Sequence, residues 1–342
     1  MDIQDALAKI VEGNDLSREE SSEVFNVIMT GGATDAQIGA FLSAMRVKGE
    51  TPSELAGAAL TMRNLSTKVE LPPTKNLVDT CGTGGSGLKL FNISTAAAFV
   101  ASAAGAIVAK HGNRKMTSFC GSADLLEAAG VNLDLTAPQI SQCVKEIGIG
   151  FMFAPAHHSA MRHAGPVRQE LGIRTMMNIL GPMTNPAGAK RQVIGVFSPT
   201  WQLKIAEVLQ ILGSQHALIV HSEGLDEIRL DKPSDVVELK DNKISQYSIS
   251  PSDFGINTAN FEDLQHLSAN SVEESLQLVT ESLSNPKSQA ASIVALNAGA
   301  AIYVSGIADN LASGVTTAQH VIAEGSAKKK LDELSQLSSS MK

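Results

Sequence analysis

Apolar residues along the first seventy positions recur with the three-to-four-residue spacing of helices that bury one face. The first such face consists of Ile3, Leu7, Ile10 and Val11. Three capping-box patterns then follow, in which a Ser or Thr precedes a Glu or Gln by three positions. They are Ser17 with Glu20, Thr34 with Gln37, and Thr51 with Glu54. The pattern therefore predicts a small unit built only of helices, which ends near the stiff segment Leu71-Pro72-Pro73.

From residue 75 onward, short apolar runs of strand length alternate with longer runs of helical period. The predicted strands are Leu77–Asp79, Ala106–Lys110, Ile149–Ala154, Gln192–Phe197, Ala217–His221 and Val236–Leu239. The predicted helices are Thr95–Ala104, Asp124–Ala129, Pro138–Ile147, Trp201–Leu212, Val272–Ser284 and Ala290–Val304, with one more after Thr317. This alternation is typical of an α/β domain with a mostly parallel central sheet. We therefore expect a small N-terminal all-helical domain at residues 1–72, joined by a helical segment near 159–182, and a larger α/β domain at 73–342.

The composition of the 342-residue chain is that of a globular protein, with 43% hydrophobic and 18% charged residues. A formal net charge of −8 argues against a general surface for nucleic acid. Three scattered cysteines without a CxxC pair indicate neither a disulfide framework nor structural zinc, and they suit a reducing cytoplasm. We expect no membrane partner, because no signal peptide and no long apolar stretch are evident.

A glycine-rich stretch, Asp79-Thr-Cys-Gly-Thr-Gly-Gly-Ser-Gly87, lies between a predicted strand and a predicted helix. Glycine lets the backbone approach a ligand closely, and N–H groups of such a loop and of the following helix start attract phosphate. A dinucleotide site would also need an acid about 20 residues later, where Lys110 and His111 stand instead. A P-loop would need a lysine where Leu88 stands. We interpret the stretch as another kind of phosphate loop, with a plain tight turn as the alternative.

A second polar segment, Lys110-His-Gly-Asn-Arg-Lys115, follows the next predicted strand. Its charges could simply be solvated, but Gly112 in the middle indicates a constrained backbone. Loops after neighbouring parallel strands gather at one edge of the sheet. The two segments together therefore predict a large phosphorylated substrate.

Three further groups are candidates for chemistry. Asp226 and Glu227 follow a predicted strand and would suit Mg²⁺ beside a polyphosphate, although adjacent acids are often only solvated. Arg168 would suit a substrate carboxylate, with an ordinary helix-surface arginine as the alternative. His157 and His158 are adjacent, so their side chains diverge and a shared zinc ion is disfavoured.

These motifs and several others, in chain order, resemble the anthranilate phosphoribosyltransferase family of tryptophan biosynthesis. The motifs are Gly82-Thr-Gly-Gly85, Asn92-Ile-Ser-Thr95, Lys110-His-Gly-Asn-Arg114, Gly121-Ser-Ala-Asp124, Pro166-Val-Arg-Gln-Glu-Leu-Gly172, Arg174-Thr-Met-Met-Asn178, Leu180-Gly-Pro-Met-Thr-Asn-Pro186 and Gly224-Leu-Asp-Glu227. The resemblance implies a helical domain, a larger α/β domain, a cleft between them and a homodimer formed through the helical domain. The chain departs from the family at Ser86, where an acid is common, and at Leu90, where a small hydroxyl residue is common.

The resemblance also implies roles for individual residues. The implied contacts with phosphoribosyl pyrophosphate (PRPP) are Gly82, Gly85, Ser86, Leu90, Asn92, Ile93, Ser94, Thr95, Lys110, His111, Gly112, Asn113, Arg114, Lys115, Met116, Thr117, Ser118 and Ser122. The implied contacts with anthranilate are Gly82, Asn113, His158 and Arg168. Ser94, Asp226 and Glu227 are implied to hold magnesium, with two Mg²⁺ ions per monomer. No residue is implied as a covalent nucleophile.

The implied activity is transfer of the phosphoribosyl group of PRPP to the amine of anthranilate. This gives N-(5-phosphoribosyl)anthranilate and pyrophosphate, in the second step of tryptophan biosynthesis from chorismate. One alternative is a nucleoside phosphorylase-like enzyme, which would bind inorganic phosphate and lack the Lys110–Arg114 run. The other is a non-catalytic relative that binds nucleic acid, which the net charge of −8 opposes.

Overall fold

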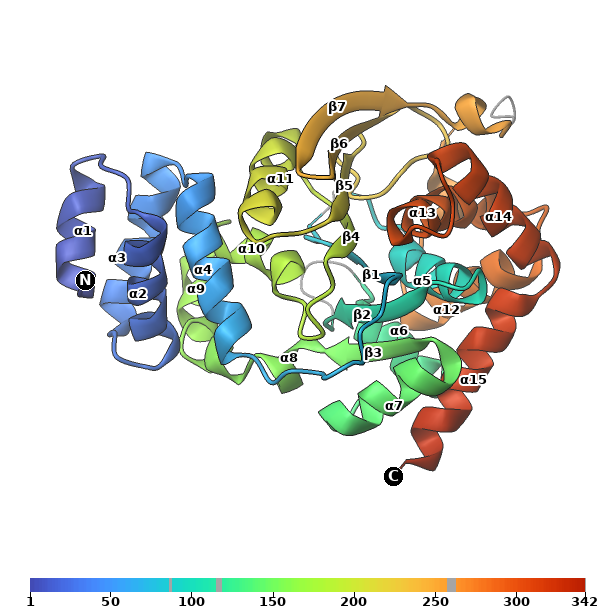
Figure 1. Cartoon of the computed structure of the whole chain (residues 1–342), viewed down its shortest axis with the longest axis horizontal. Helices are drawn as coiled ribbons and strands as arrows, with labels where there is room; N and C mark the ends of the chain where they lie inside the picture. Colours follow the sequence, from blue (N-terminus) through green and yellow to red (C-terminus); the bar gives the residue numbers. More distant parts are fainter. Residues whose placement is uncertain (86–87, 115–118, 257–262, 342) are drawn as a thin grey trace.

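The predicted helical unit is present in the computed structural model, which describes residues 1–85, 88–114, 119–256 and 263–341. Its helices are α1 (Ile3–Val11), α2 (Arg18–Met29), α3 (Asp35–Lys48) and α4 (Pro52–Leu65). All three predicted capping boxes are confirmed, because the side chains of Ser17, Thr34 and Thr51 each accept the expected backbone N–H. Figure 1 shows these four helices as a bundle beside the α/β layers.

The α/β part is built on a seven-stranded sheet with the strand order β3-β2-β1-β4-β5-β6-β7. The strands are β1 (Leu77–Gly82), β2 (Ile107–Gly112), β3 (Ile149–Phe153), β4 (Arg191–Gly195), β5 (His216–His221), β6 (Ser234–Lys240) and β7 (Lys243–Ile249). Strands β1 to β5 pair in parallel, and β6 and β7 are antiparallel. The mostly parallel sheet is therefore confirmed.

Strand β7 was not predicted. It forms a hairpin with β6 through Asp241 and Asn242, whose φ angles of 48° and 60° are both positive. Two positive φ angles are the mark of the two-residue turn that suits twisted hairpins, and Asp and Asn tolerate that region. Strand β7 carries mostly polar, exposed side chains at the sheet edge, so it lacks the apolar run that identified the other strands.

Eleven further helices surround or follow the sheet in the described part of the chain. They are α5 (Ile93–Ala103), α6 (Ser122–Ala128), α7 (Ala137–Ile147), α8 (Ala154–His157), α9 (Gly165–Leu171), α10 (Met177–Leu180), α11 (Gln202–Ile211), α12 (Val272–Ser284), α13 (Gln289–Ser305), α14 (Leu311–Ala323) and α15 (Ser326–Ser340). Short 3-10 turns lie at Ser159–Arg162, Gly181–Thr184, Pro199–Trp201, Pro251–Phe254 and Gln265–Leu267. The prediction of one more helix after Thr317 was incomplete. Helix α14 begins six residues before Thr317, at Leu311, where Asn310 caps it by accepting the N–H of Ser313, and α15 follows it. None of the described helices is long and apolar enough to span a bilayer.

Two hydrophobic cores hold the sheet. One joins one sheet face to α5, α12, α13, α14 and α15. The other runs from the four-helix unit through residues 164–183 to the sheet face covered by α11. The segment predicted to join the helical unit lies against it, and Arg63 Nε donates to the carbonyl of Met183 at 2.6 Å. The exact division into domains stays a prediction.

Because β1, β2, β4 and β5 are parallel, their carboxyl ends meet at one edge of the sheet. Two of the predicted boundaries were wrong there. Strand β1 extends to Gly82, which pairs with Gly195, and β2 extends to Gly112, which pairs with Phe153. The residues from Lys110 to Gly112 therefore lie in a strand, where ladder hydrogen bonds fix them more firmly than a loop would.

At the opposite end of β5, one carboxylate joins the β6–β7 hairpin to α13. Oxygen atoms of Glu238 lie 2.8 Å from His216 Nε2, 2.9 Å from the hydroxyl of Tyr247 and 2.7 Å from the hydroxyl of Tyr303. Burial raises the pKa of Glu238, but these hydrogen bonds together outweigh burial and hold the pKa below its usual value.

We expect Glu238→Gln to lower the free energy of unfolding at pH 7 by about 2 kcal/mol, because one amide oxygen cannot accept all three donors. A carboxyl group with a lowered folded pKa stabilises the fold above its unfolded pKa of 4.5, and this stabilisation is lost as the pH falls through the folded pKa. The deficit of the variant should therefore shrink between pH 7 and pH 3. Urea unfolding of both proteins across that range measures it, and a constant deficit would contradict the assignment.

Candidate functional site

The glycine-rich loop after β1 is held on both sides. Thr83 donates its backbone N–H to the carbonyl of Gly195 at 2.9 Å, and Gly84 donates to Asp226 Oδ2 at 3.1 Å. Arg174 donates to the carbonyl of Gly85 at 2.7 Å. The φ angles of Gly84 and Gly85 are 66° and 80°, in the left-handed region that favours glycine. The structure thus shows a constrained loop; Ser86 lies outside the described residues.

The start of α5 faces the acidic pair. Ser94 donates its backbone N–H to Glu227 Oε1 at 3.2 Å, so this helix start already binds a carboxyl oxygen. The side chain of Asn92 is used inside the protein, since it accepts from Ser275 Oγ and donates to the carbonyl of Cys120. Ile93 is buried in the core, so only its backbone can face a ligand.

The two remaining candidates of this segment also lie inward. Thr95 is fully buried, and its hydroxyl has no hydrogen-bond partner among the described residues. Leu90 is half-buried against the core and forms a bridge with Ser268. The helix start is therefore the part of this segment best placed to bind anions.

Asp226 and Glu227 stand at the centre of the sheet edge, in the loop after β5. Burial raises the pKa of Glu227 to about 8, and the charge of Asp226 adds to this effect, while Lys110 opposes it. A cation bound beside Glu227 would stabilise its ionised form, which burial disfavours. Carboxylate and hydroxyl oxygens are the donors that Mg²⁺ prefers, so Asp226, Glu227 and the nearby Ser94 fit this ion.

No group of three His, Cys, Asp or Glu side chains is arranged to hold a metal among the described residues. Two carboxylates alone suit Mg²⁺, which keeps water and takes phosphate oxygens as further ligands.

Lys110 is buried within the same edge, with 3% of its surface exposed. Its ammonium group donates to the carbonyl of Thr80. Burial lowers the pKa of Lys110, and the negative charges of Asp79 and Glu227 partly restore it. Lys110 therefore lies within electrostatic range of Asp79 and Glu227.

Asp79 and Asn185 fix the start of the second polar segment, although sequence reasoning assigned no role to either side chain. Asp79 is fully buried and accepts the backbone N–H of His111 at 3.1 Å. Its other oxygen accepts from Asn185 Nδ2 at 2.8 Å. The amide of Asn185 also donates to the carbonyl of Ala109 at 2.9 Å, so one pair holds β1 and β2 together below the site.

Beyond β2, the predicted phosphate ligands fall into two groups. Ser122, at the start of α6, lies within 3.4 Å of the carbonyl of Asn113, so these two residues are brought together. The guanidinium of Arg114 turns away toward α6, where it donates to Glu127 at 2.6 and 2.9 Å and to Asp124 at 3.2 Å. These carboxylates raise the pKa of Arg114. Lys115, Met116, Thr117 and Ser118 lie outside the described residues.

Two buried histidines meet beside this segment. The ring centres of His111 and His158 are 5.1 Å apart. Burial lowers the pKa of His158 to about 4 and that of His111 well below its usual value, so both rings are neutral at pH 7. The adjacent His157 points elsewhere, since its Nδ1 lies 2.9 Å from the carbonyl of Thr67.

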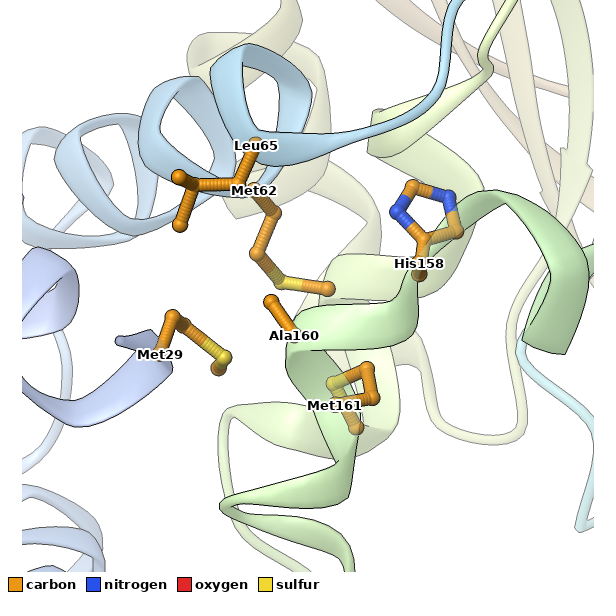
Figure 2. Close-up of a pocket in the computed structure, with 6 residues that line it drawn as sticks. All are labelled: Met29, Met62, Leu65, His158, Ala160 and Met161. Atoms are coloured by element: carbon orange, nitrogen blue, oxygen red, sulfur yellow. The ribbon is translucent and has the colours of Figure 1, made fainter. Parts of the chain in front are cut away.

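His158 also borders a small apolar cavity that the sequence did not reveal (Figure 2). The other lining residues are Met29, Met62, Leu65, Ala160 and Met161, which come from α2, α4 and the turn after His158. The space is about 10 Å³, which is the size of one water molecule. Three of these lining residues are methionines, whose unbranched side chains adapt easily to a neighbouring group.

Arg168 lies on α9, in the segment between the helical unit and the sheet. It is half-buried, and burial lowers its pKa. Arg162, six residues earlier, is exposed. Among Arg162, Arg168 and Arg174, Arg168 is thus the one that is half-buried, and its helix α9 packs against α3.

Comparison with protein families matches both parts of the chain. Residues 4–66 match the helical bundle domain of a glycosyl transferase family, and residues 74–328 match the α/β domain of a glycosyl transferase family.

Curated relatives match over nearly the whole chain. The anthranilate phosphoribosyltransferase of Cellvibrio japonicus is 55% identical over 98% of this chain and 98% of its own length. That of Hahella chejuensis is also 55% identical, over 100% of this chain and 99% of its own.

Solved structures agree. The crystal structure of the anthranilate phosphoribosyltransferase from Thermus thermophilus has a TM-score of 0.92 at 41% identity, over 98% of this chain and 99% of that one. The Saccharomyces cerevisiae enzyme in complex with PRPP and Mg has a TM-score of 0.87 at 24% identity, over 99% and 98%. A second structure of the yeast enzyme, with a TM-score of 0.86, contains 4-fluoroanthranilate.

Proposed function

Because the chain belongs to the anthranilate phosphoribosyltransferase family, we propose that it transfers the phosphoribosyl group of PRPP to the amine of anthranilate. The products are N-(5-phosphoribosyl)anthranilate and pyrophosphate. One structural observation carries the proposal: the glycine loop, the start of α5 and the acidic pair converge through Gly84 N–H on Asp226 and Ser94 N–H on Glu227. Backbone donors beside carboxylates suit a substrate that arrives as a metal-bound polyphosphate.

PRPP is assigned to the loops after β1 and β2 and to the start of α5. This assignment is supported by the constrained glycine loop and by the N–H groups that point toward the acidic pair. Asp226, Glu227 and Ser94 would hold Mg²⁺, with two ions per monomer as the family resemblance implies. When bound, Mg²⁺ would neutralise the charge that develops on the departing diphosphate.

Anthranilate is assigned to His158, Asn113, Gly82 and Arg168, as the family resemblance implies. The neutral rings of His111 and His158 offer aromatic surface to a benzoate ring. Burial disfavours the charged form of Arg168, and a bidentate carboxylate partner would stabilise that form. The apolar cavity beside His158 supplies adaptable surface at the same place.

The proposed reaction forms a bond between the anthranilate nitrogen and C1 of the ribose, while the bond from C1 to the pyrophosphate oxygen breaks. The electron pair leaves with pyrophosphate, and the nitrogen gives up its proton to the departing pyrophosphate or to water. An aromatic amine is neutral and nucleophilic at pH 7, so the site needs no covalent nucleophile and no strong base. Lys110 and the loop N–H groups would balance the negative charge, and the protein mainly aligns the two substrates.

The homodimer, the cytoplasmic location and the division at residues 72 and 73 also belong to this proposal. The homodimer is implied by the family resemblance, the location is suggested by the cysteine usage, and the division is suggested by the segment Leu71-Pro72-Pro73. A nucleoside phosphorylase-like activity is not favoured, because the full-length relatives are anthranilate phosphoribosyltransferases. Nucleic-acid binding is opposed by the net charge of −8.

The direct test is the loss of anthranilate fluorescence on mixing the protein with PRPP, anthranilate and Mg²⁺. Consumption that requires all three additions supports the proposal. A gel-shift titration with DNA and RNA runs beside it. Nucleic-acid binding without anthranilate consumption would overturn the proposal.

We expect Arg168→Ala to raise the KM for anthranilate about 30-fold, because the carboxylate loses a charge-assisted partner worth about 2 kcal/mol. The KM for PRPP and kcat should change much less. Arg162→Ala is the matched control, since Arg162 is exposed in the same segment. Steady-state kinetics decide the matter, and an unchanged anthranilate KM in Arg168→Ala would remove the role of this residue.

A further inference from the structure

Asn297 is a buried amide in the middle of α13. Only 3% of its surface is exposed, and the helix around it consists almost entirely of buried apolar and small residues. Asparagine is a poor helix former, and a buried amide destabilises a protein unless its polar atoms are hydrogen-bonded. The position of Asn297 is therefore unfavourable by itself, and the compensation must come from its partners.

The side chain of Asn297 pairs with both backbone groups of a single residue. Its Oδ1 accepts the N–H of Ile228 at 2.9 Å, and its Nδ2 donates to the carbonyl of Ile228 at 2.9 Å. The second hydrogen of Nδ2 is directed to the carbonyl of Ile293, one turn earlier in α13, also at 2.9 Å. A carboxamide carries two donor hydrogens and an acceptor oxygen, and all three are hydrogen-bonded here.

Ile228 directly follows Glu227, so the two residues share one peptide unit. The plane between the two residues contains the carbonyl of Glu227 and the N–H of Ile228. Ser222 Oγ donates to that carbonyl at 2.8 Å, and Asn297 accepts that N–H. Because the peptide unit is rigid, holding both of its polar groups fixes the direction in which the chain leaves Glu227.

The side chains of Asp226 and Glu227 are held by other segments than the one that holds their backbone. Asp226 Oδ2 accepts the N–H of Gly84, and Glu227 Oε1 accepts the N–H of Ser94. These partners belong to the phosphate-binding segments, whereas Asn297 belongs to the buried helix behind the sheet. Among the hydrogen bonds of the described residues, those of Asn297 tie the acidic loop to α13.

We propose that Asn297 is a positioning residue for the acidic pair: by pairing with both backbone groups of Ile228, it sets how Asp226 and Glu227 present their oxygens to a divalent cation. This inference rests on the magnesium role given to the pair under the proposed function. Residues that orient metal ligands typically change metal affinity by about 10- to 100-fold when replaced. Asn297 touches neither substrate nor metal, so its effect must pass through the loop.

The test uses Asn297→Leu in the full-length protein. Leucine has a similar volume and suits a helix, but it leaves the N–H and carbonyl of Ile228 without partners. The first measurement is the rise in melting temperature caused by PRPP over a Mg²⁺ titration, without anthranilate, so that no turnover occurs. We expect the half-saturating Mg²⁺ concentration to be about tenfold higher in the variant.

A matched control removes a buried amide elsewhere. Gln202 on α11 is 4% exposed and donates to the carbonyls of Ile219 and Asp235, both at 2.8 Å. Gln202→Leu should lower the melting temperature as much as Asn297→Leu does, yet leave the half-saturating Mg²⁺ concentration within about twofold of the original, well short of the change expected for a residue that orients metal ligands. General destabilisation is thereby separated from a specific effect on the acidic loop.

Hydrogen exchange supplies a readout that involves no metal. The amide of Ile228 should exchange at least about tenfold faster in Asn297→Leu than in Gln202→Leu, since its acceptor is gone only in the former. If Asn297→Leu is insoluble, Asn297→Ser replaces it, because serine keeps the helix packing and still cannot bond both groups of Ile228. The same direction of change is expected for it.

Asp226→Asn separates the two proposals. A raised half-saturating Mg²⁺ concentration in Asp226→Asn together with an unchanged one in Asn297→Leu would overturn the inference and leave the proposed function intact. Unchanged values in both variants would overturn the magnesium role of the acidic loop, and the inference with it. A raised value in both, with Gln202→Leu unaffected, supports the positioning role.

Discussion

Replacing both acids, Asp226→Asn with Glu227→Gln, is expected to lower kcat/KM for PRPP about a thousandfold at about 1 mM Mg²⁺. The two carboxylates are the anionic oxygens assigned to the cation, and stabilisation of a departing phosphate by a metal is worth several kcal/mol, which corresponds to about three orders of magnitude in rate. Steady-state rates over a Mg²⁺ titration measure this. A magnesium dependence equal to that of the original enzyme would remove the metal assignment.

The same double variant should be no less stable than the original protein. Burial and the charge of Asp226 raise the pKa of Glu227 to about 8, so the ionised form is disfavoured in the metal-free protein. A raised folded pKa contributes stability below the unfolded value of 4.5 that is lost as the pH rises toward 8. Neutral glutamine avoids that loss. The melting temperature of the metal-free variant at pH 8 should therefore equal or exceed that of the original, and a large decrease would mean that the activity loss reflects unfolding.

Local signals in the sequence were sufficient for most of the framework. Each capping box joins residues three apart, so Ser17, Thr34 and Thr51 could be identified as helix starts without knowledge of the fold. The five parallel strands are largely buried on both faces, and each contains a short apolar stretch that identified it. The edge strand β7 is mostly exposed, so the same signal was missing there.

The sequence indicated a candidate site, but the contacts among its residues could not be predicted from it. Glycine-rich and acidic segments after predicted strands indicated which edge of the sheet would carry the candidate site, because parallel topology brings such segments together. The partners of single side chains are set by residues far apart in sequence. Arg114 turns to Glu127, Asp79 meets Asn185, and neither pairing has a local pattern that reveals it.

The apolar cavity beside His158 shows the same limit. Met29, Met62 and Met161 come from three separate segments, and each reads simply as a core residue in its own helix or turn. Only the packing of residues 159–184 against α2 and α4 brings them together. Sequence periodicity reports which face of a helix is apolar, not which other face it will meet.

Gly195, at the end of β4, is the clearest case of a residue whose importance depends on distant contacts. A Cβ atom built there would lie 1.6 Å from the carbonyl oxygen of Asp226, and one built on the neighbouring Gly82 would lie 2.6 Å from Asp226 Oδ2. The acidic loop can reach the sheet edge only because both positions lack side chains. The carbonyl of Gly195 also accepts the N–H of Thr83, so this residue connects the acidic loop and the glycine-rich loop.

We therefore expect Gly195→Ala to lower the free energy of unfolding by about 3 kcal/mol, which is the upper range for overpacking a core, and to reduce kcat/KM at least about a hundredfold by displacing Asp226. The clash with the Asp226 carbonyl cannot be relieved by a change of rotamer, because that carbonyl belongs to the backbone of a loop held by Ser222 and Asn297. Gly181→Ala is the matched control, since Gly181 is helical and a Cβ there meets nothing within 4 Å. Thermal unfolding and the anthranilate assay measure both effects. If Gly195→Ala behaved like Gly181→Ala, the close approach of the acidic loop to β4 would not be required for catalysis.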